Sequence, residues 1–263
     1  MNDITKKIIT KLPILKKPRK ITIAFIEYLK HPKKITYDSK VFFRKQKAQK
    51  IGISYFDPNF IYFNTFDKNS VVVDVGCGYE ADFSKHIIYK YNAKVFAIDP
   101  TKKHRKFLKV IEEEAKGKFT HLQLAISSKN GKITFKETQD NESGSILNDH
   151  VNILKDKIKS YEVESMTLNN LPDKINSEII DFLKLDIEGA EYELLAKVTK
   201  DNLKPFKQIF IEFHHNAIKS YSLSDTKTIV KSICEKGFNY FTLDDVNYLF
   251  YNLKYFKNNN ISK

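Results

Sequence analysis

Three side chains that can move a proton or hold a cation stand at the ends of two apolar runs. Asp186 and Glu188 follow the run "FLKL" at 182–185, and His214 ends the run "IFIEF" at 209–213. Carboxylates and imidazoles act as general acids and bases, and they also bind divalent cations. If both runs are parallel strands, their ends meet at one sheet edge, where ligands bind in open α/β folds. The sequence therefore predicts an acid and histidine site at that edge.

A glycine turn follows another apolar run, in "VVVDVGCGYEADF" at 71–83. Gly76 and Gly78 permit a tight turn and close approach of a ligand to the backbone. Asp99 stands 21 positions after Gly78, where a carboxylate can accept hydrogen bonds from ribose hydroxyls. This pattern fits NAD or S-adenosylmethionine. Asp74 favours S-adenosylmethionine, because it can hold the amino end of the cationic methionine moiety but would repel a pyrophosphate. A glycine turn without a ligand is the remaining alternative.

The elements that position these residues alternate between strand and helix. The runs at 70–76, 93–99 and 119–127 are typical of buried strands, and residues 81–91 and 103–116 have apolar side chains at helical spacing. This rhythm predicts a doubly wound, mostly parallel sheet.

The second half of the chain begins less regularly and then resumes the rhythm. Asn130–Gly131 predicts a hairpin arm, and the alternation in residues 161–168 predicts an edge strand. We then expect two further strand–helix pairs, with strands at 179–187 and 207–215 and helices at 188–198 and 222–238. A turn at 244–247 predicts an antiparallel hairpin at the end of the sheet.

The acids after the strand at 179–187 do not all require a functional explanation. With a helix from residue 188, Asp186 lies near the N-cap, and Glu188 and Glu191 complement the helix dipole, worth about 0.3–1 kcal/mol each. Glu193 is expected in solvent. This explanation leaves out Asp186, and it leaves out Gly189, which suggests a close approach by another group.

Several of these motifs together resemble the FkbM family of S-adenosylmethionine-dependent methyltransferases. "FLKLDIEGAEYELL" is similar to the family signature K-x-D-x-E-G-x-E, and "VVVDVGCG" and "VFAIDP" to its cofactor loop and second strand. "LAISSKNGKITF", "SGSI", "VESMTLNNL" and "IFIEFH" are similar to further family segments. The resemblance runs from about residue 68 to 250. It implies a Rossmann-like class I methyltransferase with a seven-stranded sheet, which acts on hydroxyls of sugars or related metabolites.

The chain departs from the family pattern at three places. The cofactor loop more often reads G-A-N-x-G, whereas the present sequence has Gly76-Cys77-Gly78-Tyr79. Asp99 replaces a glutamate, and Asn169 and Asn170 replace the aspartates of a T-L-D-D run. The second departure is conservative, and the third puts any role of those aspartates in doubt.

The residues expected to act follow from the motifs and the resemblance. The cofactor-binding residues are expected to be Asp74, Gly76, Cys77, Gly78, Tyr79, Asp99, Pro100, Ala125 and Asp186. For catalysis we expect His214 or Asp186 as the general base, with Glu188 orienting the other or the substrate; a purely structural His214 is the alternative. A divalent metal at Asp186, Glu188 and His214 stays open, because the spacing does not indicate one.

Composition and charge limit the rest. The 263 residues are 41% hydrophobic, enough for one large α/β domain, and the two cysteines favour a reducing compartment. We expect a cytoplasmic protein, with attachment to a membrane surface left open. Residues 1–50 hold fifteen Lys/Arg against three Asp/Glu, which is twelve of the thirteen net positive charges. We expect a basic extension at 1–60, a methyltransferase domain at 61–257 and a polar tail at 258–263.

Partners and competing functions follow from the same features. The expected acceptor is a hydroxylated small molecule or glycan, and the basic segment could bind an anionic membrane surface. An RNA ribose methyltransferase is the first alternative, since basic segments also bind nucleic acid. A non-catalytic module that binds anionic surfaces and an NAD-dependent oxidoreductase are the others. The oligomeric state is not indicated.

Overall fold

The computed structural model of the protein describes residues 32–256, with side chains from residue 39. The chain divides into two compact units after Phe43. Residues 32–43, the described part of the first unit, belong to helix α3 (Pro32–Lys50). Most of the basic segment, residues 1–31, and the tail at 257–263 lie outside the described residues. Among the described residues, no helix is both long enough and apolar enough to cross a membrane.

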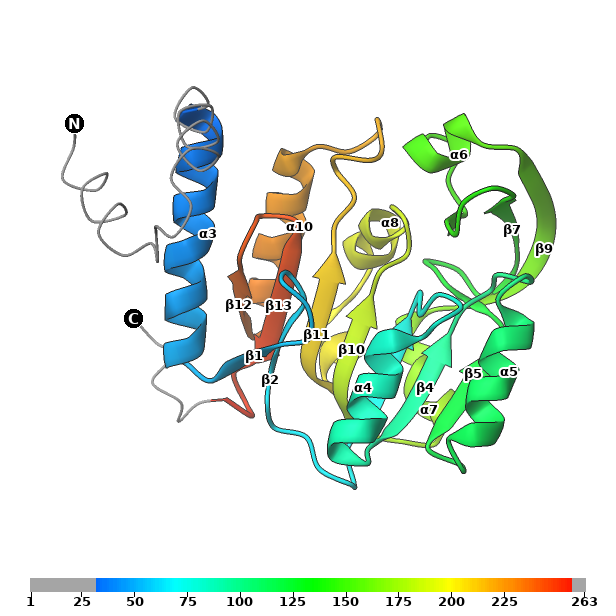
Figure 1. Ribbon diagram of the computed structural model, residues 1–263, viewed down its shortest axis with the longest axis horizontal. Coiled ribbons are helices and arrows are strands. Elements are labelled where there is room, and N and C mark those ends of the chain that lie inside the picture. The colour runs from blue at the N-terminus through cyan, green and yellow to red at the C-terminus, as the bar shows by residue number, and fades with distance from the viewer. Residues whose placement is uncertain (1–31, 257–263) are drawn as a thin grey trace, which may run out of the picture. The chain divides into compact units, whose positions relative to one another are not determined.

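A seven-stranded sheet forms the centre of the second unit (Figure 1). Its five parallel strands and one antiparallel terminal hairpin confirm the predicted doubly wound topology. The spatial order is β12 (Phe238–Thr242), β13 (Asn247–Asn252), β11 (Phe206–Glu212), β10 (Ile180–Leu185), β3 (Val71–Val75), β4 (Lys94–Ile98) and β5 (Phe119–Leu122). The chain order reverses between β3 and β10, and this switch point is where open α/β sheets bind ligands.

Helices cover both faces of this sheet because each central strand is apolar on both sides. One buried cluster joins Val73 and Val75 to one set of helices, and another joins Val72 and Val95 to the other set. The first set contains α7 (Leu171–Ile175), α8 (Glu191–Ala196), α9 (Lys200–Leu203) and α10 (Leu223–Glu235); the second contains α4 (Asp82–Tyr91) and α5 (Arg105–Glu114). A 3-10 turn, η1 (Leu168–Asn170), precedes α7.

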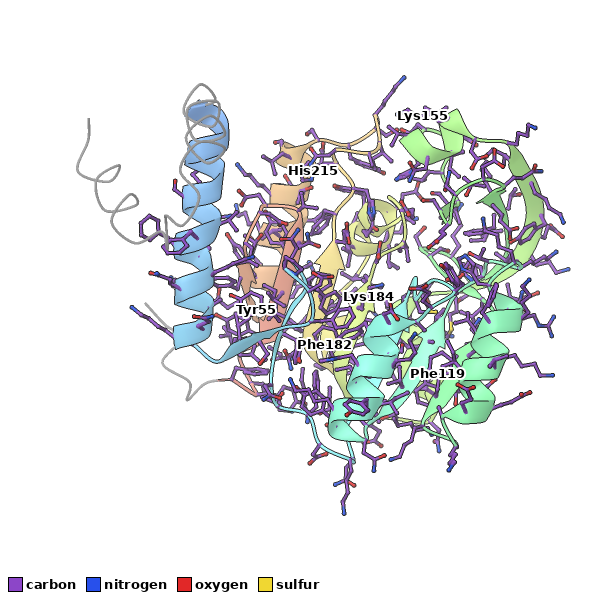
Figure 2. All side chains as sticks on the ribbon, in the orientation of Figure 1. Tyr55, Phe119, Lys155, Phe182, Lys184 and His215 are labelled. Atoms are coloured by element: carbon purple, nitrogen blue, oxygen red, sulfur yellow. The ribbon has the colours of Figure 1, made fainter. Side chains whose placement is uncertain are left out.

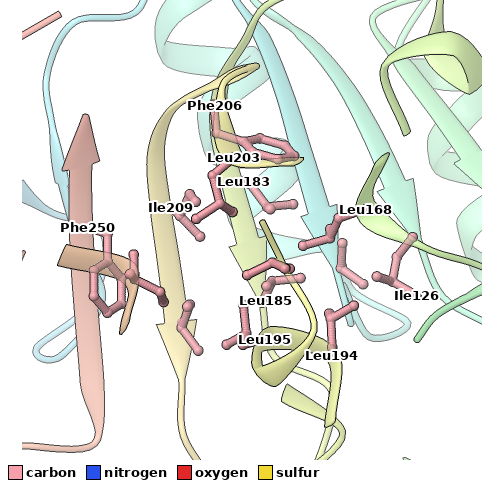
Figure 3. Close-up of a cluster of buried hydrophobic side chains, with 14 of the residues drawn as sticks. Ile126, Leu168, Leu183, Leu185, Leu194, Leu195, Leu203, Phe206, Ile209 and Phe250 are labelled. Carbon is pink, nitrogen blue, oxygen red and sulfur yellow. The ribbon is translucent and has the colours of Figure 1, made fainter. Parts of the chain in front are cut away.

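The core beneath the carboxyl edge of the sheet combines aliphatic and aromatic side chains. Figure 3 shows Leu183 and Leu185 of β10 packed among leucines of α8 and Ile209 of β11. Each of these side chains is almost fully buried. The strand end that carries Asp186 is therefore held by close packing on the side of α8.

A second sheet lies in the segment that looked irregular in the sequence. Its strands, in spatial order, are β6 (Ala125–Ile126), β9 (Ile158–Met166), β7 (Gly131–Thr138) and β8 (Gly144–Ser145). The strand predicted after Asn130–Gly131 is confirmed as β7, but the turn does not close a hairpin, because β6 and β7 each pair with β9 and not with each other. The edge-strand prediction for residues 161–168 is wrong, because β9 pairs on both sides, parallel to β6 and antiparallel to β7. The predicted strand at 119–127 is in fact β5 and β6, in two different sheets.

A short strand pair and a short helix are among the elements that the sequence did not predict. β1 (Ile53–Tyr55) and β2 (Ile61–Phe63) form an antiparallel pair, and Phe63 is joined to Gln208 of β11 by backbone–side chain hydrogen bonds. Helix α6 (Val151–Lys155) follows the β8 loop and begins at His150. The β1–β2 pair closes the core on the side of α4, and helix α6 brings His150 into the interior.

Candidate active site

A cavity of about 410 Å³ lies at the carboxyl ends of β3, β4 and β10. This is the size of a small-molecule site. All nine residues expected to bind the cofactor line it: Asp74, Gly76, Cys77, Gly78, Tyr79, Asp99, Pro100, Ala125 and Asp186. Glu188 also lines the cavity, whereas His214 lies behind the two acids. The structure thus brings the glycine turn and the acids to one space.

Gly76 is required by the way two strand ends meet. Its φ is +75°, and a Cβ placed on it would lie 1.8 Å from the backbone oxygen of Asp186. The Asp186 amide donates to the Val75 carbonyl at 3.2 Å, which holds the ends of β10 and β3 side by side. No side chain fits between them. The glycine therefore joins the cofactor loop to the acidic loop.

Asp99 is a buried carboxylate with fixed orientation. It accepts hydrogen bonds from the amides of Gly78 at 3.1 Å and Thr101 at 2.8 Å, and its Oδ2 lies 3.1 Å from His104 Nδ1. Burial raises the pKa of Asp99, but the bonds from His104 and Thr101 outweigh this and leave the pKa below its ordinary value. Asp99 also lines the cavity, so a ligand hydroxyl there can approach its carboxylate.

Lys184 contacts both the glycine turn after β3 and the acidic loop after β10. Figure 2 labels this residue, whose Nζ donates to the Gly76 carbonyl at 2.8 Å and lies 3.3 Å from both Asp74 Oδ1 and Asp186 Oδ2. Burial lowers the pKa of Lys184, yet the charges of Asp74 and Asp186 more than offset that effect and raise the pKa above its ordinary value. A permanent cation thus fixes both acids. Asp74 is also bonded by Ser84 Oγ at 2.7 Å.

The predicted catalytic residues meet at one corner of the cavity. His214 Nε2 lies 3.6 Å from both Asp186 Oδ1 and Glu188 Oε2. A fourth side chain joins them, since His150 Nε2 lies 2.8 Å from Glu188 Oε2. Three of the four come from the ends of β10 and β11, and His150 comes from the start of α6. The corner contains both proton acceptors and possible metal ligands.

Glu191 stands in the first turn of α8, as the dipole interpretation expected, but it is not an ordinary surface acid; for Glu188, which precedes the helix, that interpretation was wrong. Its side chain is fully buried, accepts a hydrogen bond from the Ile187 amide at 2.9 Å and lies 3.0 Å from His214 Nδ1. The helix begins at Glu191 rather than at Glu188. Asp186 consequently lies outside the N-cap, and Glu191 holds the loop and orients His214. Glu193 is exposed, as predicted.

Glu188 and Gly189 form the turn that the sequence hinted at. Glu188 has a φ of +54°, and Gly189 a φ of +101°, with Leu147 only 2.8 Å from the position a Cβ would take. Ser145 Oγ donates to the Glu188 carbonyl at 2.9 Å. The close approach predicted at Gly189 is confirmed, and the group that approaches is a side chain of the β8 loop.

The electrostatics of the corner come from crowded carboxylates. Burial lowers the pKa of His214, but the charges of Glu191, Asp186 and Glu188 raise it to about 10. Burial raises the pKa of Glu188, and its contacts with His150 and His214 bring it below the ordinary value. Burial and then repulsion from Asp186 raise the pKa of Glu212 to about 7. Negative charge thus exceeds what the nearby groups neutralise.

Three residues of the site were missed from the sequence. Lys184 stands inside the signature K-x-D-x-E-G-x-E, so its position was a usable signal. Glu212 ends β11, two residues before His214, and lines the cavity. His150 gave no signal, because it reaches the corner through a loop with no regular pattern.

A second, wider groove of about 920 Å³ adjoins the cavity and shares Tyr79, His104 and Glu142 with it. Its lining is basic: Lys102, Lys103, Arg105, Lys106 and Lys109 line it, against Asp140 and Glu142. Phe107, which is 44% exposed, also lies there. Such a surface can attract an anion.

Comparison with known proteins gives one informative match. A family model described as the methyltransferase FkbM domain matches residues 67–240, more than half of the chain. No protein of curated function matches the sequence.

Similar solved structures are distant. Fibrillarin, a pre-rRNA processing protein of Methanococcus jannaschii, is 15% identical over 70% of this chain and 67% of its own, with a TM-score of 0.40. M. capricolum TrmK, solved with S-adenosylhomocysteine, is 11% identical over 71% of this chain and 62% of its own, with a TM-score of 0.37. Human methyltransferase 10 domain containing protein is 12% identical over 81% of both chains, with a TM-score of 0.39. These scores are too low to add to the assignment of function.

Proposed function

Because the chain belongs to the FkbM family of S-adenosylmethionine-dependent methyltransferases, we propose that it methylates a hydroxyl group of a sugar, a glycan or a related hydroxylated metabolite. The cofactor's sulfonium methyl group passes to the acceptor oxygen. The carbon–sulfur bond breaks as the carbon–oxygen bond forms, and the hydroxyl proton goes to a base. The products are S-adenosylhomocysteine and a methyl ether.

One observation carries this proposal. The cofactor loop and the acids Asp186 and Glu188 line the same cavity, and the backbone of Gly76 touches that of Asp186. In-line transfer requires the acceptor oxygen, the methyl carbon and a base within a few ångströms. A site with the acids elsewhere would not support the reaction.

The cofactor would be held by the glycine turn and by Asp99. The turn at Gly76–Gly78 lets the ligand approach the backbone, and Asp99 would accept a hydrogen bond from a ribose hydroxyl at the cavity wall. Asp74 is 1% exposed and already paired with Lys184 and Ser84. We therefore assign Asp74 to shaping the loop rather than to holding the amino end of the methionine moiety.

Asp186 is the base in this proposal, on grounds of position. Its carboxylate lines the cavity and is 27% exposed as a side chain, whereas His214 does not line the cavity. Lys184 and His214 hold the carboxylate from two sides, at 3.3 and 3.6 Å. Glu188 lies beside it and would orient the acceptor. A positioned base of this kind contributes about 10²–10⁴-fold to a rate.

The test is transfer of label from methyl-labelled S-adenosylmethionine into fractionated cell extract. The proposal predicts label in glycan or small-metabolite fractions, as an ether resistant to mild alkali and to ribonuclease. Asp186→Asn should lower the transfer rate about 10²–10⁴-fold while S-adenosylmethionine still binds. Label in protein alone, or an unchanged rate with Asp186→Asn, would overturn the proposal.

A second function, methylation of an RNA ribose, is favoured by the basic groove. Arg105, Lys106 and the exposed ring of Phe107 beside the cavity resemble a surface for phosphates and stacked bases. Outside residues 1–50 the chain carries only about one net positive charge, which does not favour an extended RNA track. The same assay tests the second function. Ribonuclease-sensitive label that Arg105→Ala reduces, and that Lys231→Ala on helix α10 leaves unchanged, would establish it in place of the first.

A further inference from the structure

The geometry points to a divalent metal site formed by His150, Glu188 and His214 at the corner of the cavity. One ligand atom from each residue lies within 4.8 Å of the other two. The inference deepens the proposed methyl transfer, and the catalytic use of the ion rests on that proposal. The existence of the metal site does not depend on methyl transfer. The ion class is a zinc-like transition metal.

Two distances between the donor atoms lie on either side of the ligand spacing around a small cation. His214 Nε2 lies 3.6 Å from Glu188 Oε2, too far for a hydrogen bond, while His150 Nε2 lies 2.8 Å from the same oxygen. Around a tetrahedral zinc ion, with bonds of about 2.0–2.1 Å, neighbouring ligand atoms stand about 3.3–3.4 Å apart. To reach that spacing, the His214 and Glu188 atoms would approach by about 0.3 Å and the His150 and Glu188 atoms would separate by about 0.5 Å. The ligand atoms of the two histidines lie within 4.8 Å of each other.

His150 adds a buried ring nitrogen that lacks a hydrogen-bond partner. Its side chain is 1% exposed, and its Nε2 has no hydrogen-bond partner, since the contact with Glu188 is close but poorly directed. A buried polar nitrogen without a partner is costly. The nitrogen faces the Glu188 carboxylate, on the side where His214 also points its Nε2. A metal ion there would give it a partner.

His214 has the surroundings of a metal-bound histidine. Its Nδ1 lies 3.0 Å from Glu191 Oε1, and the Glu191 side chain is fully buried. Ligating histidines usually donate their second ring N–H to such a carboxylate, which directs the other nitrogen at the metal. The second oxygen of Glu191 has no partner either. Glu191 thus serves the site from behind rather than as a ligand.

Charge favours a cation at this corner. The carboxylates of Asp186, Glu188 and Glu191 lie 3.0–3.6 Å from His214, and Glu212 lines the same cavity. Lys184 faces only Asp186 among them, and a metal ion on His214 Nε2 would take the place of the proton there. Buried carboxylates in excess need a positive partner. A divalent ion beside Glu188 and His214 would supply two charges at the centre of the group.

One contact opposes the ion and yields a structural signature. The amide of Asn152 donates to His150 Nδ1 at 3.2 Å, which caps helix α6 and leaves the proton on Nε2. A metal on Nε2 moves that proton to Nδ1 and breaks the cap. Because α6 has only five residues, its first turn can give way. Metal binding should therefore speed hydrogen exchange at the Asn152 amide.

Two imidazoles and one carboxylate select zinc-like ions over magnesium or calcium, which prefer oxygen ligands. Three protein ligands leave a coordination position open. Of the three ligands, Glu188 lines the cavity, so an open position on its side would face the acceptor. A hydroxyl bound there becomes more acidic. The ion would thus make the acceptor a substrate that a carboxylate such as Asp186 can deprotonate.

The experiment uses tag-free, chelator-dialysed full-length protein titrated with Co²⁺ and Zn²⁺ separately. One Co²⁺ should bind per chain, with visible absorption typical of a mixed nitrogen and oxygen site, and Zn²⁺ should displace it. His150→Ala and Glu188→Gln should each weaken binding at least about 100-fold. His215→Gln, adjacent in sequence but bonded to Thr226, should bind as the wild type does.

The outcomes separate this inference from the proposed function. No metal binding by a folded wild type that still binds S-adenosylmethionine overturns the metal site alone. Metal binding that both variants retain, or that leaves exchange at Asn152 unchanged, overturns the assignment of its ligands. Should His150→Ala fail to fold, Glu188→Gln and the wild-type exchange data decide. Loss of S-adenosylmethionine binding in the wild type, with metal binding intact, leaves the site and removes the proposed function.

Discussion

Replacing Lys184 with methionine should cost about 3–5 kcal/mol of unfolding free energy, the usual effect of removing one partner of a buried ion pair. Methionine keeps most of the apolar stem, so packing changes little. The loss comes from Asp74, which is 1% exposed and has its Oδ1 3.3 Å from the ammonium. The Gly76 carbonyl also loses its 2.8 Å bond, while Asp186, 27% exposed as a side chain, regains water. A loss of this size is a large fraction of a typical stability of about 5–15 kcal/mol.

Urea unfolding at pH 7 measures the effect, with equal slopes for wild type and variant as the check on two-state behaviour. Lys109→Met is the matched control, because this lysine is 73% exposed and pairs loosely with Glu113 at 3.8 Å. It should change stability by less than about 1 kcal/mol. Adding Asp74→Asn to Lys184→Met should restore part of the loss, since the uncompensated charge is then gone. Equal stability of the two lysine variants would refute the buried ion pair.

Three further predictions concern the site. Gly76→Ala should abolish S-adenosylmethionine binding or folding, because the new Cβ would lie 1.8 Å from a backbone atom. Gly78→Ala should cost only about 1 kcal/mol of stability, because Gly78 has a φ of +67° but open space around it. Melting and binding assays distinguish the two variants. Ser145→Ala should cost about 0.5–1.5 kcal/mol in denaturant unfolding, since it removes the hydrogen bond to the half-buried Glu188 carbonyl. Asp99 has a folded-state pKa below its ordinary 3.8, so it stabilises the fold above that pH; the stability is lost as pH falls further, because the unfolded chain then binds more protons. Asp99→Asn should flatten this acid limb; an unchanged limb would contradict it.

The sequence predicts the main sheet well because its strands and helices alternate with clear apolar periods. It also predicts which residues face the cavity, since ligands gather at the carboxyl edge of such sheets. It fails at β9, where alternation looks the same in an edge strand and in a strand paired on both sides. It also misses β1 and β2, three residues each, which are too short to show a period.

Within the site, local pattern could not separate the acids correctly. Glu191 looked like a helix acid because acids in a first turn are common. Its burial depends on His214, 23 positions later, and on the Ile187 amide, which no local pattern reveals. His150 reaches the corner only through the β8 loop and α6, and Lys184 is fixed by a contact with Gly76, 108 positions earlier. Long-range contacts of this kind decide chemistry without leaving a sequence period.

Calorimetric titration of the full-length protein with S-adenosylmethionine, repeated with NADH, tests the central claim most directly. The account predicts one S-adenosylmethionine per chain and no NADH binding. It also predicts about 10–100-fold weaker S-adenosylmethionine binding by a folded Asp99→Asn variant, because one hydrogen bond to a carboxylate is worth about 1.5–3 kcal/mol. Binding of NADH without S-adenosylmethionine, or equal affinity of the variant and the wild type, would contradict it.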